Sequence, residues 1–201
     1  MVNQRRPWHA VALAAGIVGL LLSSVAVAAP ATAGQVEGTI TAVEADAVTV
    51  MTPTGNPVRI VATGETLVIQ RKAVALDNIK PNDFVGVTAR REPDGSLTAL
   101  SINVFPPEFR DRVRQAQFVM DTGNVMTNAT VFQNVRRIEG RTLYLKLGDG
   151  SVVIAVPKDV AVLRLTLIRF SALRPGMPVV ARGTAGPDGT LVATTITMDV
   201  R

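Results

Sequence analysis

Cysteine is absent from the 201 residues of this chain. Its absence excludes disulfide bonds, zinc-thiolate sites, iron–sulfur clusters, thiol catalysis and a lipid anchor on an acylated cysteine. Aromatic residues make up only 4% of the chain, with one tryptophan and one tyrosine, whereas 47% of the residues are hydrophobic. The fold must therefore be held together by the packing of aliphatic side chains.

The first 33 residues have the three-part order of a secretory signal peptide. Arg5 and Arg6 stand in a start without acidic residues, an almost unbroken apolar stretch covers residues 11–27, and small residues occur at the spacing of a cleavage site at 26–28 and 31–33. We expect cleavage after Ala33, which leaves no membrane span and a periplasmic or secreted protein. The alternative is an uncleaved membrane anchor, because residues 10–29 are about long enough to cross a bilayer at roughly 1.5 Å per residue.

Cleavage would also remove the only histidine, His9, and the only tryptophan, Trp8. Without histidine or cysteine, the mature chain lacks Ser-His-Asp and Cys-His catalytic arrangements and the usual ligands of zinc, copper and haem. Most of its acidic residues, such as Asp94, Asp149 and Asp188, sit in predicted turns, where they have a structural role. We therefore expect no enzyme activity, no cofactor and no metal site. A hydrolase of unknown type, using a serine-lysine or a carboxylate pair, is the third hypothesis.

An internal repeat organises the remainder of the chain. Residues 79–104 and 173–198 align without a gap at an offset of 94 residues, and Pro-Asp-Gly at 93–95 matches Pro-Asp-Gly at 187–189. Upstream the offset becomes 95, where Gly55 matches Gly150. A matching turn followed by a matching alternation of apolar and polar residues indicates that a segment of roughly 70 residues has been duplicated.

Each copy has the pattern of an all-β domain. Apolar and polar residues alternate in short runs rich in β-branched residues, and turn-forming residues separate the runs. Five or six strands in about 70 residues would expose an edge if they stayed flat, so we expect each copy to curl into a small barrel of the oligonucleotide/oligosaccharide-binding (OB) type. The sequence thus predicts an all-β protein of two tandem OB-like β-barrel repeats, at residues 34–105 and 129–201, joined by a helical linker at 106–128.

The linker has no counterpart in the repeat and carries the predicted helix. Pro106 and Pro107 are typical of a first helical turn. Phe109, Val113 and Ala116 would then share one helical face. We therefore expect a short helix over residues 108–118.

Several turn and strand motifs of the mature chain form a familiar set. They are the opening at residues 38–43, the hairpin at Gly55, the corners at 79–81 and 173–175, the segment 126–131 and the closing Asp-Gly-[Ser/Thr]-Leu strands. In these motifs the chain resembles exported bacterial proteins with tandem OB-like β-barrel repeats, a family of domains of unknown function. The resemblance covers nearly all of the mature chain and implies the fold and the export route. It transfers no catalytic or ligand-binding residue, because the motifs are turns and strand faces.

Arginine residues supply the candidate binding surface. The formal net charge of +5 falls to +3 without Arg5 and Arg6, which is too small a bias to predict nucleic-acid binding, and few aromatic side chains are present to stack on bases. An arginine fork suits carboxylate and phosphate oxygens, so we predict an envelope protein or an anionic envelope component as the partner. The alternative is that these arginines only keep strand faces solvated. The predicted binding residues are Phe109, Arg110, Arg112, Arg114, Arg136 and Arg137.

Together these features favour a non-enzymatic exported binding module that recognises a cell-envelope component or a partner protein. The second hypothesis is a structural protein of the envelope that assembles through strand edges, and the sequence leaves the oligomeric state open. Residues 160–170 are apolar on both faces of a predicted strand except at Arg164 and Arg169. This segment therefore either packs the two repeats against each other or pairs with another chain.

Overall fold

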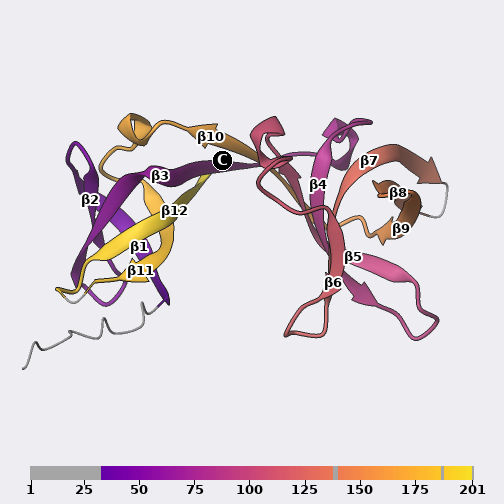
Figure 1. Ribbon diagram of the computed structural model, residues 1–201, viewed down its shortest axis with the longest axis horizontal. Helices are drawn as coiled ribbons and strands as arrows, with labels where there is room; N and C mark the ends of the chain where they lie inside the picture. Colours follow the sequence, from indigo (N-terminus) through magenta and orange to yellow (C-terminus); the bar gives the residue numbers. More distant parts are fainter. Residues whose placement is uncertain (1–32, 138–139, 187, 201) are drawn as a thin grey trace, which may run out of the picture. The chain divides into compact units, whose positions relative to one another are not determined.

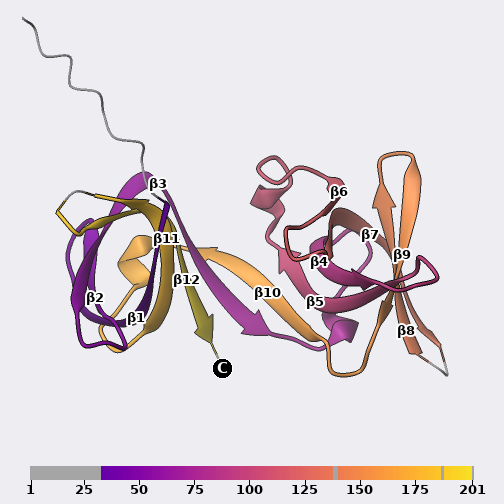
Figure 2. The ribbon, with the colours of Figure 1, turned by 90° about the horizontal axis from the view of Figure 1, so that it is seen from below.

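The computed structural model describes residues 33–137, 140–186 and 188–200, so the predicted signal peptide lies outside the described residues except for Ala33. Residues 31–201 form one compact unit. Within the described ranges the protein is all-β, as predicted, and holds no α-helix (Figures 1 and 2). None of its helical turns there is long and apolar enough to span a membrane. The elements are β1 (Ala33–Val43), β2 (Ala47–Met51), β3 (Pro57–Ala73), η1 (Leu76–Asn78), β4 (Phe84–Arg91), β5 (Leu97–Phe105), η2 (Pro107–Phe109), β6 (Ala116–Val119), β7 (Val125–Arg137), β8 (Gly140–Leu147), β9 (Gly150–Val156), β10 (Ala161–Ile168), η3 (Phe170–Ala172), β11 (Pro178–Ala185) and β12 (Leu191–Val200), where η denotes a short 3-10 turn.

Five strands close into a first barrel, in the order β12-β11-β1-β2-β3, with β3 pairing back to β12. Neighbouring strands are antiparallel, except that β12 and β3 run parallel. Aliphatic side chains from all five strands fill the interior, because the period-two alternation turns every second residue inward. The buried residues include Ile40, Val50, Ile60, Val179 and Ile196.

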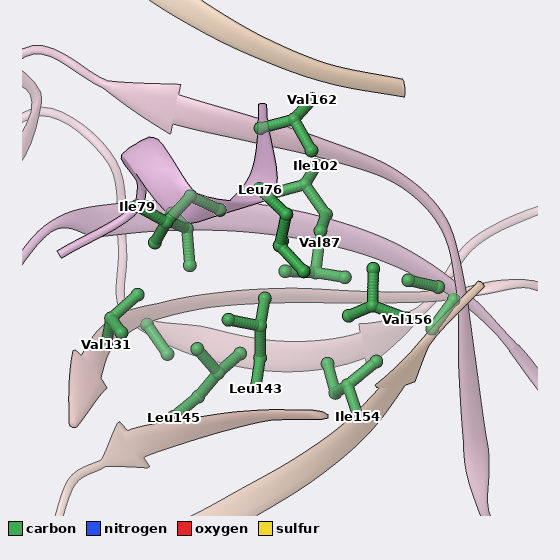
Figure 3. Packing of buried hydrophobic residues seen from close by; sticks show 14 of the residues in the cluster. Leu76, Ile79, Val87, Ile102, Val131, Leu143, Leu145, Ile154, Val156 and Val162 are labelled. Carbon is green, nitrogen blue, oxygen red and sulfur yellow. The ribbon is translucent and has the colours of Figure 1, made fainter. Parts of the chain in front are cut away.

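Five further strands form a second ring, in the order β5-β4-β7-β8-β9, and a parallel pairing of Thr98 with Ala155 joins β5 to β9. Figure 3 shows its interior, where Ile102, Leu143 and Ile154 lie among other aliphatic side chains. Leu76 of the η1 turn packs onto the same cluster. The second core is therefore built, like the first, from branched aliphatic residues.

The alternation of buried residues on β5 shifts by one position in mid-strand. Leu97 and Ala99 are buried, then Ile102 and Val104, while Leu100 between them is 42% exposed. The ladder from β5 to β4 is irregular at this point, and the ladder from β12 to β11 is irregular at the matching place. Such bulges increase the local twist, which lets short strands curve into a closed ring.

The two barrels do not coincide with the two sequence repeats. The first barrel combines β1–β3 with β11–β12, and the second combines β4–β5 with β7–β9, so each ring takes strands from both repeats. This exchange differs from the expectation that each copy closes on itself. We attribute it to β3, a 17-residue strand: its first part pairs with β2 in the first barrel, and after an irregularity at residues 63–66 its second part continues beyond β2 to pair with β10. The boundaries at residues 34–105 and 129–201 stay a prediction about the sequence.

β10 is the second-repeat counterpart of the far half of β3. It pairs antiparallel with β3 and parallel with β5, and Figures 1 and 2 both show β3 and β10 side by side. The apolar segment around residues 160–170 therefore pairs within the chain, which was one of the two expectations for it.

The helix predicted over residues 108–118 is wrong. The chain forms a single 3-10 turn at Pro107–Phe109 and then the strand β6, which pairs with the first part of β7. Two tertiary interactions outweigh the helical pattern. Phe109 is buried in an apolar cluster with Phe84 and Leu165, and β7 offers a ladder edge to the residues that follow.

Candidate functional site

A groove beside the second barrel brings together residues that lie far apart in the sequence, between positions 82 and 167. It has a volume of about 340 Å³. Its walls come from the residues at the start of β4, from the end of β5 and the turn after it, and from β10. The lining residues are Asn82, Asp83, Phe84, Phe105, Pro106, Pro107, Glu108, Arg110, Arg164, Leu165, Thr166 and Leu167.

Phe84 and Phe105 line the apolar side of the groove, and a third aromatic ring, that of Phe109, packs against Phe105. The ring centres of Phe84 and Phe105 lie 5.4 Å apart, and those of Phe105 and Phe109 lie 5.7 Å apart. Both distances are in the favourable range for tilted aromatic pairs. Phe109, a predicted binding residue, is only 7% exposed and packs in the cluster of Phe84, Leu165 and Ile69. It therefore supports the groove from below instead of lining it.

Arg110, another predicted binding residue, lies at the rim of the groove. Its guanidinium donates hydrogen bonds to the carbonyl oxygen of Asn82 and, at 3.2 Å, to Thr130 Oγ1. Its central carbon lies 5.7 Å from the centre of the Phe84 ring, which is within cation–π range. These contacts fix the orientation of the exposed Arg110 guanidinium group, so little side-chain entropy would be lost when a ligand binds.

Arg164, on β10, provides a second cation at the groove. It donates hydrogen bonds to the carbonyl oxygen of Asn78 at 2.8 Å and to Asp83 Oδ2 at 3.3 Å. Asp83 Oδ2 also accepts a hydrogen bond from the backbone N–H of Lys80 at 3.0 Å. Arg164 and Asp83 continue into an adjoining hollow of about 590 Å³ that is also lined by Lys72 and Lys80. This end of the groove therefore carries more positive than negative side chains.

The remaining predicted binding residues lie elsewhere. Arg112 and Arg114 are exposed and do not line the groove. Arg136 and Arg137 lie at the end of β7, where their backbones pair with Arg141 and Gly140. The structure thus places Arg110 at the groove and Arg112 and Arg114 outside it, whereas the side chains of Arg136 and Arg137 lie outside the described residues and their role stays a prediction.

Sequence reasoning did not assign Arg164 and Asp83 to one site. Arg164 was visible as a charge inside an apolar strand, which is a usable signal, because an arginine in such a strand needs a polar partner. Its partner Asp83 lies 81 residues away in the sequence. Only the pairing of β10 with β5 brings the two side chains together.

The groove suits binding chemistry. No cluster of three or more potential metal ligands occurs among the residues that the structure describes. Side-chain hydrogen bonds from Arg59 and from Arg90 lower the pKa of Glu44 and of Glu92, and both of these carboxyl groups lie outside the groove. An apolar wall beside fixed guanidinium groups fits a ligand that carries a flat or apolar part next to an anionic group.

The first barrel has a hollow at the position that corresponds to the groove, but different side chains line it. The offset of 94 residues places Phe84 on Pro178 and Phe105 on Asp199, and both of these residues line a hollow of about 290 Å³. There Asp199 accepts two hydrogen bonds from Arg71, at 2.7 and 2.8 Å. The ion pair replaces the aromatic pair, so the aromatic groove is particular to the second barrel.

The comparisons with known proteins concern the first part of the chain. No curated protein and no solved structure matches the chain. Residues 37–103 match the model of the family described as Domain of unknown function (DUF5666). The matched segment runs from β1 into β5, so its strands contribute to both barrels. Residues 37–103 of this chain are therefore a DUF5666 domain.

Proposed function

We propose that this protein is a non-enzymatic binding module of the bacterial cell envelope, exported by its N-terminal segment, that recognises an envelope component or a partner protein. The observation that carries the proposal is the groove in which Phe105, Arg110 and Arg164 meet. A concave site with an apolar wall and a few fixed polar groups is the usual form of a binding site.

The charges favour an anionic ligand. Arg110 and Arg164 both line the groove, and Lys72 and Lys80 extend the positive charge into the adjoining hollow. Guanidinium pairs with carboxylate, sulfate or phosphate oxygens through two parallel hydrogen bonds. The ligand class is therefore an acidic envelope component, such as a uronate or phosphate-bearing glycan, or an acidic segment of a partner protein.

A second candidate is a structural protein that assembles through strand edges. It is favoured by β6, a short strand that exposes Phe118 by 48% and Val119 by 67%. Exposed apolar residues on an edge strand promote pairing with other chains. Sedimentation at rising protein concentration distinguishes the two candidates, because only assembly through edges increases the mass.

The groove is tested by titrating the purified exported protein with uronate-containing and phosphate-containing glycans and following binding by calorimetry. We expect Arg110→Ala to weaken binding about tenfold or more, because a charge-assisted hydrogen bond contributes about 1.5–3 kcal/mol. Arg112→Ala is the matched control, since Arg112 lies two residues away, is exposed and does not line the groove. Equal losses for the two variants would contradict the assignment of the groove.

A plugging variant tests the same site without removing a charge. Thr166 is exposed on β10 and lines the groove, so Thr166→Trp should fill the groove and abolish ligand binding while the protein stays folded. Ligand binding that persists in this variant would place the binding site elsewhere.

A further inference from the structure

The first part of β7 is paired on both of its edges. Val125, Met126, Thr127 and Asn128 pair with β4 on one side, and the same four residues pair with β6 on the other. β6 reaches this position through a hairpin whose turn holds Gly123 at a positive φ of 80°. In the second barrel, therefore, a neighbouring segment of the chain covers this edge.

The equivalent edge in the first barrel is open. β11 is the counterpart of β4 in the second repeat, at an offset of 94 residues. Residues 34–37 of β1 pair with β11 in the same register in which residues 125–128 of β7 pair with β4. β2 pairs with β1 only from Thr39 onward. Among the residues that the structure describes, no strand pairs with the second edge of residues 34–37. Four residues of β1 thus lack the ladder that β6 provides on β7.

Gly38 marks the end of the open edge. A Cβ atom at this position would lie 2.1 Å from the carbonyl oxygen of Met51, so β1 and β2 approach each other too closely here for any side chain. The open edge therefore ends at residue 37 for a structural reason, and the four residues before it form a defined segment.

We propose that residues 34–37 of β1 form a strand-addition site for an extended segment of a partner polypeptide, which runs antiparallel to β1 in the position that β6 fills on β7. An unpaired strand edge presents backbone N–H and C=O groups at the spacing of a sheet, and an added strand satisfies them. This site is separate from the groove and does not depend on the function proposed for it.

The side chains of β1 define the chemistry of the added strand. Val36 is half-buried and packs against the core of the first barrel, so the residue opposite it should be apolar. Glu37 is exposed and has no salt bridge among the described side chains, so the residue opposite it should be lysine or arginine. Directly opposed residues lie on the same face of a ladder, where opposite charges attract.

A partner polypeptide is favoured over a second copy of this chain. The segment of the chain that is suited to this kind of edge is β6, and β6 is already paired with β7 in the same molecule. A second copy could donate β6 in the position that β6 fills on β7 only by releasing it from its own sheet, which costs the ladder hydrogen bonds that β6 makes there. Pairing through the other edge of β6, which no described strand covers, would appear as self-association in the test below. A partner with a free extended segment has no such cost.

The probe is a fluorescent peptide with the sequence of residues 114–120 that carries Ala116→Lys and Gln117→Val. These changes place a lysine opposite Glu37 and a valine opposite Val36, as judged from the pairing of β6 with β7. We expect the exported protein to bind this peptide with a saturable rise in anisotropy. Glu37→Lys should weaken binding about threefold to fivefold, and a peptide with Ala116→Glu should recover it, because the pair is then reversed.

A capped variant tests the location of the site. In it a second copy of residues 114–124 is inserted directly before Gly34, so that the insertion can fold back onto β1 as β6 folds onto β7. The capped variant should no longer bind the peptide. The matched control carries the same insertion with Gln117→Pro and Val119→Pro in the inserted copy, which cannot continue a ladder, and it should bind as the parent does.

Three results would overturn the proposal. The first is no anisotropy change with the peptide, and the second is binding that the capped variant retains. The third is self-association of the parent protein in sedimentation that the cap abolishes, because the edge would then serve a second copy of the chain.

Discussion

Gln70 on β3 pairs with Thr166 on β10, and the neighbouring pair in the ladder is Arg71 with Leu165. The repeat offset of 95 residues places Gln70 on Leu165 and Arg71 on Thr166. If each residue is replaced by its counterpart in the other repeat, the pair Gln70–Thr166 therefore becomes the pair Leu165–Arg71, which is the next pair of the same ladder. A two-fold axis relates paired residues in the same way in a symmetric dimer. The exchange of strands between the barrels is reciprocal for the same reason, and the single chain resembles a strand-exchanged dimer joined by a linker.

The strand exchange predicts that the two halves of the chain depend on each other. A protease site inserted between Gly123 and Asn124, in the turn before β7, separates β1–β6 from β7–β12 without removing a core residue. After cleavage the two fragments should stay together on size exclusion in native buffer, because each barrel contains strands from both. After separation in urea, neither fragment alone should show a cooperative unfolding transition. Two fragments that separate in native buffer and fold independently would contradict the exchanged topology.

Gly38 should not tolerate a side chain. Gly38→Ala places a methyl group 2.1 Å from the carbonyl oxygen of Met51, a backbone atom that can move only if β2 moves. We expect a loss of about 1–3 kcal/mol in the free energy of unfolding, measured by urea denaturation. Gly64→Ala is the control, because a Cβ atom there meets no atom within 4 Å. A similar loss in both variants would mean that the close approach of β1 and β2 is not the cause.

The bulge on β5 separates a core residue from an exposed one of similar size. Ile102 is fully buried, whereas Leu100, two residues earlier, is 42% exposed. Ile102→Ala should cost about 2–5 kcal/mol of unfolding free energy, since it leaves a cavity in the second core. Leu100→Ala should cost less than about 1 kcal/mol, because its side chain is already partly solvated. Comparable losses in urea denaturation would show that the strand has a different register.

The two Asp-Gly turns of the repeat should titrate alike. Hydrogen bonds from the hydroxyl and the backbone N–H of Ser96 lower the pKa of Asp94, and Thr190 does the same for the pKa of Asp188. A lowered pKa in the folded state means that each turn adds stability above the ordinary aspartate pKa. That contribution is lost as the pH falls through the lowered value.

Carbon-detected NMR titration checks this pair within one sample. Ser96→Ala removes the hydroxyl donor, so the pKa of Asp94 should rise toward its ordinary range, while the pKa of Asp188 should stay where it was. A simultaneous shift of both carboxyl groups would mean that the effect is global, and no shift at all would remove the hydroxyl as the cause.

Part of the candidate site was accessible from the sequence. Arg110 was predicted from its charge, and the structure places it at the groove. Phe109 was predicted as part of the arginine-bearing linker helix, yet burial with Phe84 and Leu165 makes it a supporting residue. Arg164 was visible as a charge within an apolar strand, but its hydrogen bond to Asp83 was not predicted, because it depends on the pairing of distant segments.

The local pattern of the sequence determined the all-β class, the turns and the residues that face inward. The alternation of apolar and polar residues and the preferences of turn residues depend on near neighbours in the chain, so they can be recognised from the sequence alone. The helix expected after Pro107 failed because the edge of β7 and the pocket for Phe109 lie outside that local window.

Tertiary structure alone decided which strands share a barrel. β4 and β11 carry the same pattern of residues, as do β5 and β12. The sequence of β1 therefore does not show whether β1 pairs with β4 of its own repeat or with β11 of the other repeat. The choice follows from the length of β3, which extends past its own barrel and pairs with β10. Tertiary structure also decided the edges: β6 covers one edge of β7, because it forms a hairpin with it, while no strand among the described residues covers the same edge of β1.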